Sequence, residues 1–295
     1  MPALSVIVPV QNEEPAIAGV LEELHTVLAS APEVSAFEIL VVDDGSTDGT
    51  AEAVRVAAEG WPAIRLLARD RNRGYGAAIK HGLHHATHDL VAIIDGDGSY
   101  PAEKIPEMLR AMGEAAMIVG ARSRTGAVPL IRRPAKWLLT RLASFLADEK
   151  IPDLNSGLRI FRKEACLRFI RLLPQGFSFT TTLTLAMLCD EMAVKFFPID
   201  YRPRAGLSKI HPIRDTLSFL MLIITTITYF RPLKIVGPLA LVLVLAGVIK
   251  GSINLLFPDN PEHRPNLKTT DLLLIVSGIQ VFALALLADL ISKRR

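Results

Sequence analysis

The stretch Leu90–Pro101, which reads LVAIIDGDGSYP, decides how the rest of the sequence is interpreted. Its apolar run Val91–Ile94 is typical of a strand that is buried on both faces. The run ends in Asp95 and Asp97, which a single glycine separates. In open α/β sheets, the carboxyl ends of parallel strands line the crevice in which ligands bind. We therefore expect both carboxylates to lie at a ligand site.

Asp95 and Asp97 are predicted to bind Mg²⁺ or Mn²⁺ together with a diphosphate. Two carboxylates this close repel each other unless a cation lies between them. Hard ions of this kind are usually held by one or two carboxylates and the phosphates of a substrate. A calcium loop that began at Asp95 would need glycine at its sixth position and glutamate at its twelfth, where this chain has Tyr100 and Pro106. The calcium loop is excluded, and an ordinary turn is the alternative that remains.

The sequence around this stretch alternates between strand and helix patterns. Leu4–Val10 and Phe37–Val42 are further apolar runs, and Ile17–Ala29 between them carries leucine and valine at helical spacing. Strands over Ile64–Ala68 and Ala116–Gly120, with helical patterns between them, continue the series. This order predicts an α/β fold with a doubly wound, mostly parallel sheet.

The loop before the predicted helix at 77–86 is rich in arginine and glycine. It begins at Arg69, reads RDRNRGYGAA and lacks the third glycine of the dinucleotide-binding fingerprint. Backbone amides and guanidinium groups in such a loop suit a diphosphate. Candidate donor ligands are therefore Arg71, Gly74 and, in the helix, Lys80. A solvated basic turn explains the same pattern and stays open as the alternative.

Composition narrows the class of protein. The chain has 295 residues, a formal net charge of +3 and two cysteines. This modest charge argues against a nucleic-acid-binding protein. Cys166 and Cys189 lack metal-ligand spacing, which suggests core thiols in a reducing compartment. Met1–Val10 has no signal-peptide pattern, so nothing indicates secretion.

The last part of the chain is predicted to cross a membrane twice. Apolar segments at 233–257 and 272–291 are each long enough to cross about 30 Å of hydrocarbon. Arg231 and Lys234 lie at the start of the first segment, and three basic residues follow the second. By the positive-inside rule, both termini and the catalytic part are expected on the cytoplasmic side of the inner or plasma membrane. The shorter apolar segment at 216–230 is predicted to be an interfacial helix, with a third spanning segment as the alternative.

The chain is therefore divided into a cytoplasmic catalytic domain over 1–210, an interfacial amphipathic region over 211–232 and a transmembrane pair over 233–295. Two basic segments of the catalytic part, at 122–141 and 201–209, suit phosphates or anionic headgroups.

A lipid phosphate is one acceptor that would suit such a site, and it has a second pKa of about 6. As a sugar acceptor it needs arginines that hold it in line, and no strong general base. A nucleotide-sugar would bring its diphosphate to the metal, which stabilises the leaving group as a Lewis acid.

Four motifs give the sequence a resemblance to a known family. They are VPVQNE at 8–13, VVDDGS at 41–46, DGD at 95–97 and GLSK at 206–209. Their order and spacing resemble the family 2 glycosyltransferases with a GT-A fold. Within these, the chain resembles the polyprenyl-phosphate glycosyltransferases, such as dolichol-phosphate mannose synthases and undecaprenyl-phosphate glucosyltransferases. The resemblance covers residues 4 to about 210, and the membrane tail of two helices also suits that branch.

The resemblance implies an inverting, metal-dependent transfer of a sugar from a UDP- or GDP-linked donor to a polyprenyl phosphate (undecaprenyl or dolichyl) at the cytoplasmic membrane face. For the donor it implies Pro9, Asn12, Glu13, Asp43 and Asp44, with Asp95 and Asp97 on the metal and diphosphate. For the acceptor phosphate it implies Arg122, Arg132 or Arg133, Ser156 and Arg159. Arg202 or Arg204, together with Lys209, would close over the reacting phosphates. A separate flippase and a downstream glycosyltransferase are expected partners.

Two other functions stay open. The same fold with a glycerolipid or sphingolipid hydroxyl as acceptor needs a carboxylate base, for which Asp153 is the best candidate. The other is a non-catalytic scaffold in a glycan-assembly complex, against which the intact Asp43, Asp95, Asp97 and Lys209 argue. The sequence does not assign the sugar, the nucleoside, the lipid chain length or the oligomeric state, and a homo-oligomer is left open.

Overall fold

The computed structural model of the protein describes residues 1–123, 140–145, 147–176, 178–202, 212–257 and 267–293. The chain divides into two compact units, Met1–Leu222 and Ile223–Arg295. This division falls inside helix α8 (Pro212–Phe230). The three-part division drawn from the sequence, with an interfacial region over 211–232, stays a prediction.

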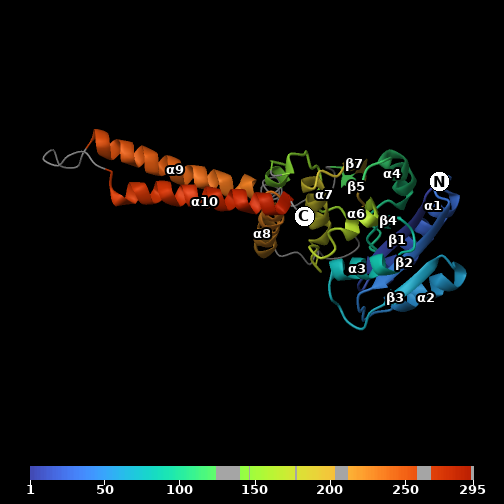
Figure 1. Cartoon of the computed structure of the whole chain (residues 1–295). Coiled ribbons are helices and arrows are strands. Elements are labelled where there is room, and N and C mark those ends of the chain that lie inside the picture. The colour runs from blue at the N-terminus through green and yellow to red at the C-terminus, as the bar shows by residue number, and fades with distance from the viewer. Residues whose placement is uncertain (124–139, 146, 177, 203–211, 258–266, 294–295) are drawn as a thin grey trace. The chain divides into compact units, whose positions relative to one another are not determined.

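The first unit is built around a seven-stranded sheet (Figure 1). Its strands are β1 (Ala3–Val10), β2 (Ala36–Asp43), β3 (Ile64–Ala68), β4 (Leu90–Ile93), β5 (Met117–Arg122), β6 (Arg159–Arg162) and β7 (Val194–Ile199). Their order in the sheet is β3-β2-β1-β4-β6-β5-β7. Strand β6 runs antiparallel to both of its neighbours, while the other strand pairs among the described residues are parallel. The predicted mostly parallel α/β sheet is confirmed.

Helices cover both faces of the sheet, which explains why β1 is apolar along its length. Val6 and Val8 of β1 lie in the core with Ile17 of α1 (Glu14–Ser30). Ile7 points the other way and packs against Gly82 of α3 (Tyr75–His85), where an added Cβ would overlap it. Because successive side chains of a strand point to opposite faces, α1 and α3 cover opposite faces. This is the doubly wound arrangement that the sequence predicts.

Further helices of the first unit lie among the described residues. They are α2 (Thr50–Gly60), the 3-10 turn η1 (Ala102–Lys104), α4 (Ile105–Met112), α6 (Lys163–Leu167) and α7 (Phe179–Cys189). Every residue of α7 is buried, so this helix is a core element of the first unit. Cys166 and Cys189 are buried free thiols, as predicted.

The second unit contains helices α9 (Pro232–Leu256) and α10 (Thr269–Lys293). Both are long and apolar enough to cross a membrane, and they begin and end within three residues of the predicted segments. Small residues let them approach closely: a Cβ at Gly247 would collide with Ile275, and one at Gly278 would collide with Val244. Close packing through small residues is typical of paired membrane helices.

A polar cluster joins α9 to α10 at the end of the pair next to their connecting segment. Asn254 Nδ2 donates to Asp271 Oδ2 at 2.7 Å. Lys250 Nζ donates to Thr270 Oγ1 at 2.9 Å and lies 3.6 Å from Asp271 Oδ1. Lys250, a cation far inside the first apolar segment, therefore has protein partners, and the cluster fixes which turns of the two helices face each other.

Candidate functional site

The loops that follow β1 and β2 are tied together at the carboxyl edge of the sheet. Asn12 has a φ of +57°. Its backbone N–H donates to Ser46 Oγ at 2.9 Å, and its side-chain Oδ1 accepts from the Thr47 N–H at 2.8 Å. The Glu13 N–H donates to Thr50 Oγ1 at 2.9 Å. Asn12 and Glu13 thus fix the shape of this edge, next to Pro9, which pairs in register with Val42.

Asp43 and Asp44 continue β2 into the same edge, and both are buried. Asp43 Oδ1 accepts from the Ser46 N–H at 2.9 Å. Asp44 accepts the backbone N–H groups of Arg73 at 3.1 Å and Gly74 at 2.7 Å, and it pairs with Arg69 at 2.9 Å. Asp44 therefore anchors the loop between β3 and α3.

That loop also touches the β2 loop through its backbone. Gly45 has a φ of +72°, and a Cβ there would lie 2.6 Å from the carbonyl carbon of Arg71. Only glycine tolerates both this conformation and this approach. The Arg71 side chain itself is exposed at the rim. Arg71 and Gly74, two predicted donor ligands, therefore lie next to Asp44 and Asp43.

Asp95 lies just beyond β4 and is held by groups from two other elements. The Tyr75 hydroxyl, at the start of α3, donates to Asp95 Oδ1 at 2.8 Å. On the other side the carboxylate lies against Gly157, where an added Cβ would collide with it. The Gly157 N–H donates to the Tyr100 hydroxyl at 2.7 Å. Burial, reinforced by the charge of Asp95, raises the pKa of Tyr75 and of Tyr100, so both phenols stay protonated at neutral pH.

Asp97 lies in the turn after β4. Its Oδ1 accepts from the Ser99 N–H at 3.0 Å and from the Ser99 hydroxyl, and Ser99 is fully buried. Ser99 thus orients the second carboxylate, as Tyr75 orients the first. Among the described residues no three His, Cys, Asp or Glu side chains converge to hold a metal. A pair of carboxylates fits a hard divalent ion that takes its other ligands from phosphates and water.

Arg122 and Asp153 form a buried ion pair beside this site. Arg122 Nε and Nη2 donate to the two oxygens of Asp153 at 2.6 and 2.9 Å. The guanidinium carbon lies 5.3 Å from the centre of the Tyr201 ring, and Tyr201 meets Tyr100 edge to face at 5.1 Å. Burial alone would lower the pKa of Arg122, but the bonds to Asp153 outweigh it and raise the pKa. Both carboxylate oxygens of Asp153 are therefore engaged by a permanent cation.

Arg159 is fully buried behind Asp95, together with Ser156. Its Nη1 donates to the Thr180 carbonyl at 2.9 Å and to Thr184 Oγ1 at 3.1 Å, and its Nη2 donates to the Ser156 carbonyl at 2.5 Å. These bonds fasten the segment before β6 to α7. In this structure Arg159 and Ser156 are fully buried, and their contact with an acceptor phosphate stays a prediction.

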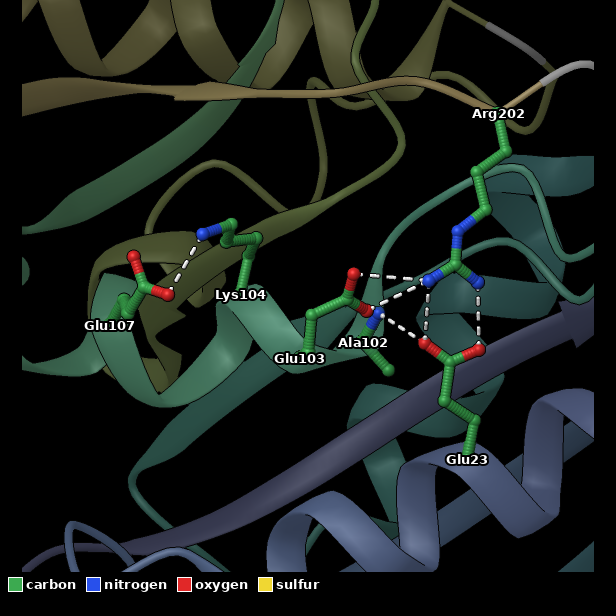
Figure 2. A network of polar contacts seen from close by, with 6 residues as sticks. All are labelled: Glu23, Ala102, Glu103, Lys104, Glu107 and Arg202. Atoms are coloured by element: carbon green, nitrogen blue, oxygen red, sulfur yellow. Dashed lines mark hydrogen bonds and ion pairs between the residues drawn. The ribbon is translucent and has the colours of Figure 1, made fainter.

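Arg202, which follows β7, is bonded to helix α1 and to the 3-10 turn η1 (Figure 2). It donates to both oxygens of Glu23 of α1, at 2.9 and 3.2 Å, and to Glu103 of η1 at 3.0 Å. Its backbone N–H also donates to the Ser99 carbonyl at 2.9 Å. Glu23 in turn accepts from the Ala102 N–H at 3.1 Å. In this structure Arg202 is therefore an anchor for the chain that leads into 203–211, engaged by carboxylates where a phosphate contact was expected.

The comparison with known proteins agrees with this arrangement. Residues 5–169 match glycosyl transferase family 2. The chain belongs to this family. Residues 231–293 match the GtrB C-terminal hairpin, which agrees with the α9–α10 pair. The predicted GT-A glycosyltransferase fold and the predicted class of enzyme are confirmed.

Several relatives of this glycosyltransferase are known. Dodecaprenyl-phosphate galacturonate synthase of Rhizobium johnstonii is 25% identical, over 98% of this chain and 88% of its own. Dolichyl-phosphate beta-glucosyltransferase ALG5C of Trichomonas vaginalis is 30% identical, over 76% of this chain and 71% of its own. Low-salt glycan biosynthesis hexosyltransferase Agl6 of Haloferax volcanii is 28% identical over 85% of this chain. The match spans 61% of that relative, less than two thirds of its length.

The fold has a similar solved structure. Glucosyl-3-phosphoglycerate synthase from Mycobacterium tuberculosis, in complex with Mn²⁺, UDP-glucose and phosphoglyceric acid, superposes with a TM-score of 0.59. It covers 77% of this chain and 80% of its own, at 19% identity. At this identity the likeness shows a shared fold.

The predicted site residues of the glycosyltransferase fall into three groups. Asp43, Asp44, Asp95 and Asp97 lie in loops that hydrogen bonds and close backbone contacts hold at one edge of the sheet. Lys80 lies apart from them, with its Nζ on the Leu173 carbonyl. Four further candidates, Arg132, Arg133, Arg204 and Lys209, lie outside the described residues, and the others are placed in the paragraphs above.

Sequence reasoning missed the residues that orient the two central carboxylates. These are Tyr75, Tyr100, Ser99 and Gly157. Tyr75 sits between the two glycines of the loop before α3, and Gly157 lies in the segment DLNSGLR. Tyr75 falls inside a loop that was singled out in the sequence, but no spacing rule points to a tyrosine that acts on a carboxylate from another element.

Proposed function

We propose that this glycosyltransferase moves a sugar from a nucleotide-sugar to a polyprenyl phosphate at the cytoplasmic face of a membrane. The observation that carries the proposal is the carboxylate pair Asp95 and Asp97, each oriented by a buried hydroxyl, from Tyr75 and Ser99. The relatives named above for dodecaprenyl and dolichyl phosphate support the acceptor class. The GtrB-type hairpin supports a membrane location for the reaction.

The donor is expected to bind along the edge formed by the β1 and β2 loops. Asp43 and the backbone around Asn12 would hold the nucleoside, and Asp95 and Asp97 would hold a Mg²⁺ or Mn²⁺ ion with the diphosphate. The ion supplies Lewis-acid stabilisation of the leaving nucleoside diphosphate when bound. The hydroxyl of Tyr75 keeps Asp95 aimed at that position. Rigid placement of this kind lowers the cost of reorganisation during the reaction.

The ion pair of Arg122 and Asp153 favours a phosphate acceptor over a hydroxyl acceptor. A hydroxyl would need a carboxylate able to take its proton, and the oxygens of Asp153 already accept from Arg122 at 2.6 and 2.9 Å. A lipid phosphate is largely ionised at neutral pH, since its second pKa is about 6. Its oxygen would attack the anomeric carbon on the face opposite the diphosphate, which inverts the configuration. The described part of the site thus offers no support for the glycerolipid or sphingolipid alternative.

Several finer statements belong to the same proposal. Arg132, Arg133, Arg204 and Lys209 are proposed as ligands of the acceptor and donor phosphates. Both termini are proposed to lie in the cytoplasm, because basic residues flank α9 and α10 on the side of the chain's ends. A separate flippase would then move the product, and a downstream glycosyltransferase would use it.

The acceptor class can be tested directly. The full chain in detergent, with Mn²⁺ and an accepted nucleotide-sugar, is offered a short polyprenyl phosphate, the matching polyprenol, a diacylglycerol or a ceramide. We expect a glycosylated product from the phosphate alone. A product from a free hydroxyl acceptor would overturn the proposed acceptor. Nucleotide binding without any product would favour the alternative of a non-catalytic scaffold in a glycan-assembly complex.

A further inference from the structure

A basic cavity lies on the solvent side of α3, away from the paired carboxylates. Its volume is about 310 Å³, at the lower end of the range of small-molecule sites, about 300–1,000 Å³. The residues that line it are Arg69, Arg73, Ala77, Lys80, His81, His84 and Gln175. None of these seven has an acidic side chain, while three carry a permanent positive charge and two are histidines.

One stripe of helix α3 and two loop segments held by backbone hydrogen bonds form the cavity. Arg73, Ala77, His81 and His84 follow each other at spacings of four, four and three, which is one stripe of an α-helix and the turn that precedes it. The loop that carries Arg73 is fixed by the bonds of its backbone and that of Gly74 to Asp44. The segment that carries Gln175 is fixed on the other side, because its carbonyl accepts from the Ala77 N–H at 2.9 Å.

The cavity is separate from the proposed donor site. Tyr75, at the start of α3, reaches Asp95, whereas His84 lies nine residues further along, about 13 Å at 1.5 Å per residue. Neither Asp95, Asp97 nor Asp43 lines the cavity. Two lining residues connect the two regions: Arg69 pairs with Asp44 at 2.9 Å, and the Arg73 N–H donates to Asp44 at 3.1 Å.

Two basic groups of the cavity have pKa values below their ordinary ones. Burial lowers the pKa of Lys80, whose Nζ donates to the Leu173 carbonyl. Burial and the neighbouring His85, Arg69 and His84 lower the pKa of His81. The ring of His85 lies beside that of His81, with centroids 4.6 Å apart and the ring planes tilted by 59°. An anion in the cavity would favour the protonated forms of both groups, and paired arginine forks with a lysine suit phosphate oxygens.

We propose that the cavity on α3 is a second anion site, which binds a phosphate or diphosphate group outside the donor site. The chemistry is shared by a soluble phosphorylated compound and by the phosphate of an anionic lipid headgroup. Arg73 and Lys80 supply the charge, His81 and His84 supply further donors, and Gln175 closes the side opposite Arg69. The proposal is independent of the sugar and of the acceptor used in catalysis.

Inorganic pyrophosphate is the probe for this site. It is titrated by calorimetry into the full chain in neutral detergent at pH 7 and constant ionic strength. EDTA is present, so that no divalent ion recruits pyrophosphate to Asp95 and Asp97. We expect saturable binding that weakens at least about tenfold, or about 1.4 kcal/mol, in Arg73→Glu and in His84→Glu. The side chains of both residues are exposed, so neither change introduces a buried charge. The matched control is Arg55→Glu on α2, an exposed residue paired with Glu52 at 2.7 Å, which should bind like the unmodified chain.

A second arm identifies the source of the anion. The chain is placed in nanodiscs of phosphatidylcholine with or without phosphatidylglycerol. Weaker pyrophosphate binding in discs with the anionic lipid would mean that a lipid headgroup occupies the cavity, and equal binding would mean that a soluble phosphate does. Either result upholds the site. Absence of saturable binding, or binding by Arg73→Glu and His84→Glu that equals that of Arg55→Glu, would overturn it.

Discussion

The hydroxyl of Tyr75 donates a hydrogen bond of 2.8 Å to Asp95 Oδ1, and so links the first turn of α3 to the end of β4. The two residues are twenty positions apart, and the bond joins the arginine-rich loop to the first carboxylate of the Asp-x-Asp motif. Because burial raises the pKa of Tyr75, the hydroxyl remains a donor throughout the neutral pH range. The hydroxyl can therefore donate to Asp95 throughout that pH range.

Tyr75→Phe should weaken the binding of the metal ion and slow the reaction without unfolding the protein. A hydrogen bond to a charged group contributes about 1.5–3 kcal/mol, so we expect a loss of at least about tenfold in kcat/KM and a similar rise in the Mn²⁺ concentration needed for half activity. The matched control is Tyr201→Phe, which keeps the ring contacts with Arg122 and Tyr100. Equal metal dependence in Tyr75→Phe and the unmodified chain would contradict the proposed role.

Gly157→Ala should displace the Asp95 carboxylate, because an added Cβ would collide with it. We expect turnover to fall by at least about a hundredfold, in line with the cost of a displacement of about 1 Å at a reacting centre. The matched control is Gly60→Ala, since a Cβ at Gly60 has nothing within 4 Å. Activity and thermal unfolding of the three proteins are compared, and retained turnover in Gly157→Ala would show that Asp95 needs no such fixed position.

The strands and the central carboxylates could be predicted from the sequence because their signals are local. The runs Leu4–Val10 and Val91–Ile94 are apolar over the length of one buried strand, and Asp95 follows directly. The antiparallel insertion of β6 between β4 and β5 could not be predicted, because pairing depends on contacts between segments far apart in the chain. The sequence showed a short strand there but not its neighbours.

The sequence did not predict which arginine side chains are buried or paired with carboxylates. The resemblance led us to expect phosphate contacts for Arg122, for Arg159 and for Arg202 or Arg204. A cation in a motif carries no signal of whether its side chain is buried. Arg159 proved to be fully buried among carbonyl groups and a threonine hydroxyl. Arg202 proved to be held by Glu23 and Glu103, two residues that are distant in sequence and unremarkable in pattern.

Glu38 should make the stability of the first unit depend on pH. Its buried carboxylate accepts from Ser5 Oγ at 2.7 Å and from the Thr87 N–H and hydroxyl at 2.6 and 2.7 Å. Burial alone would raise the pKa of Glu38, but these bonds outweigh it and lower the pKa below 4.5. A carboxyl whose pKa is lower in the folded state stabilises that state above its unfolded pKa, and this stabilisation is lost as the pH falls through the folded value.

Glu38→Gln should therefore lower the unfolding temperature by about 2–6 °C at pH 7 and by progressively less as the pH falls below about 4.5. The full chain in detergent is followed by circular dichroism from pH 7 to pH 3. The control is Glu52→Gln, whose exposed pair with Arg55 should contribute less than about 1 kcal/mol at any pH. If the two proteins differ in unfolding temperature by the same amount at every pH, the ionised form of Glu38 does not stabilise the fold.

The measurement that tests the central claim most directly is product formation by the unmodified chain and Asp97→Asn. Each protein receives Mn²⁺ or Mg²⁺, a short-chain polyprenyl phosphate and a panel of UDP- and GDP-sugars, and the lipids are analysed by mass spectrometry. We expect a polyprenyl-phosphate sugar from a donor of this panel, formed by the unmodified chain, abolished by EDTA and absent with Asp97→Asn. Product formation by Asp97→Asn at the unmodified rate, or no lipid-phosphate sugar from any donor despite nucleotide binding, would contradict the account.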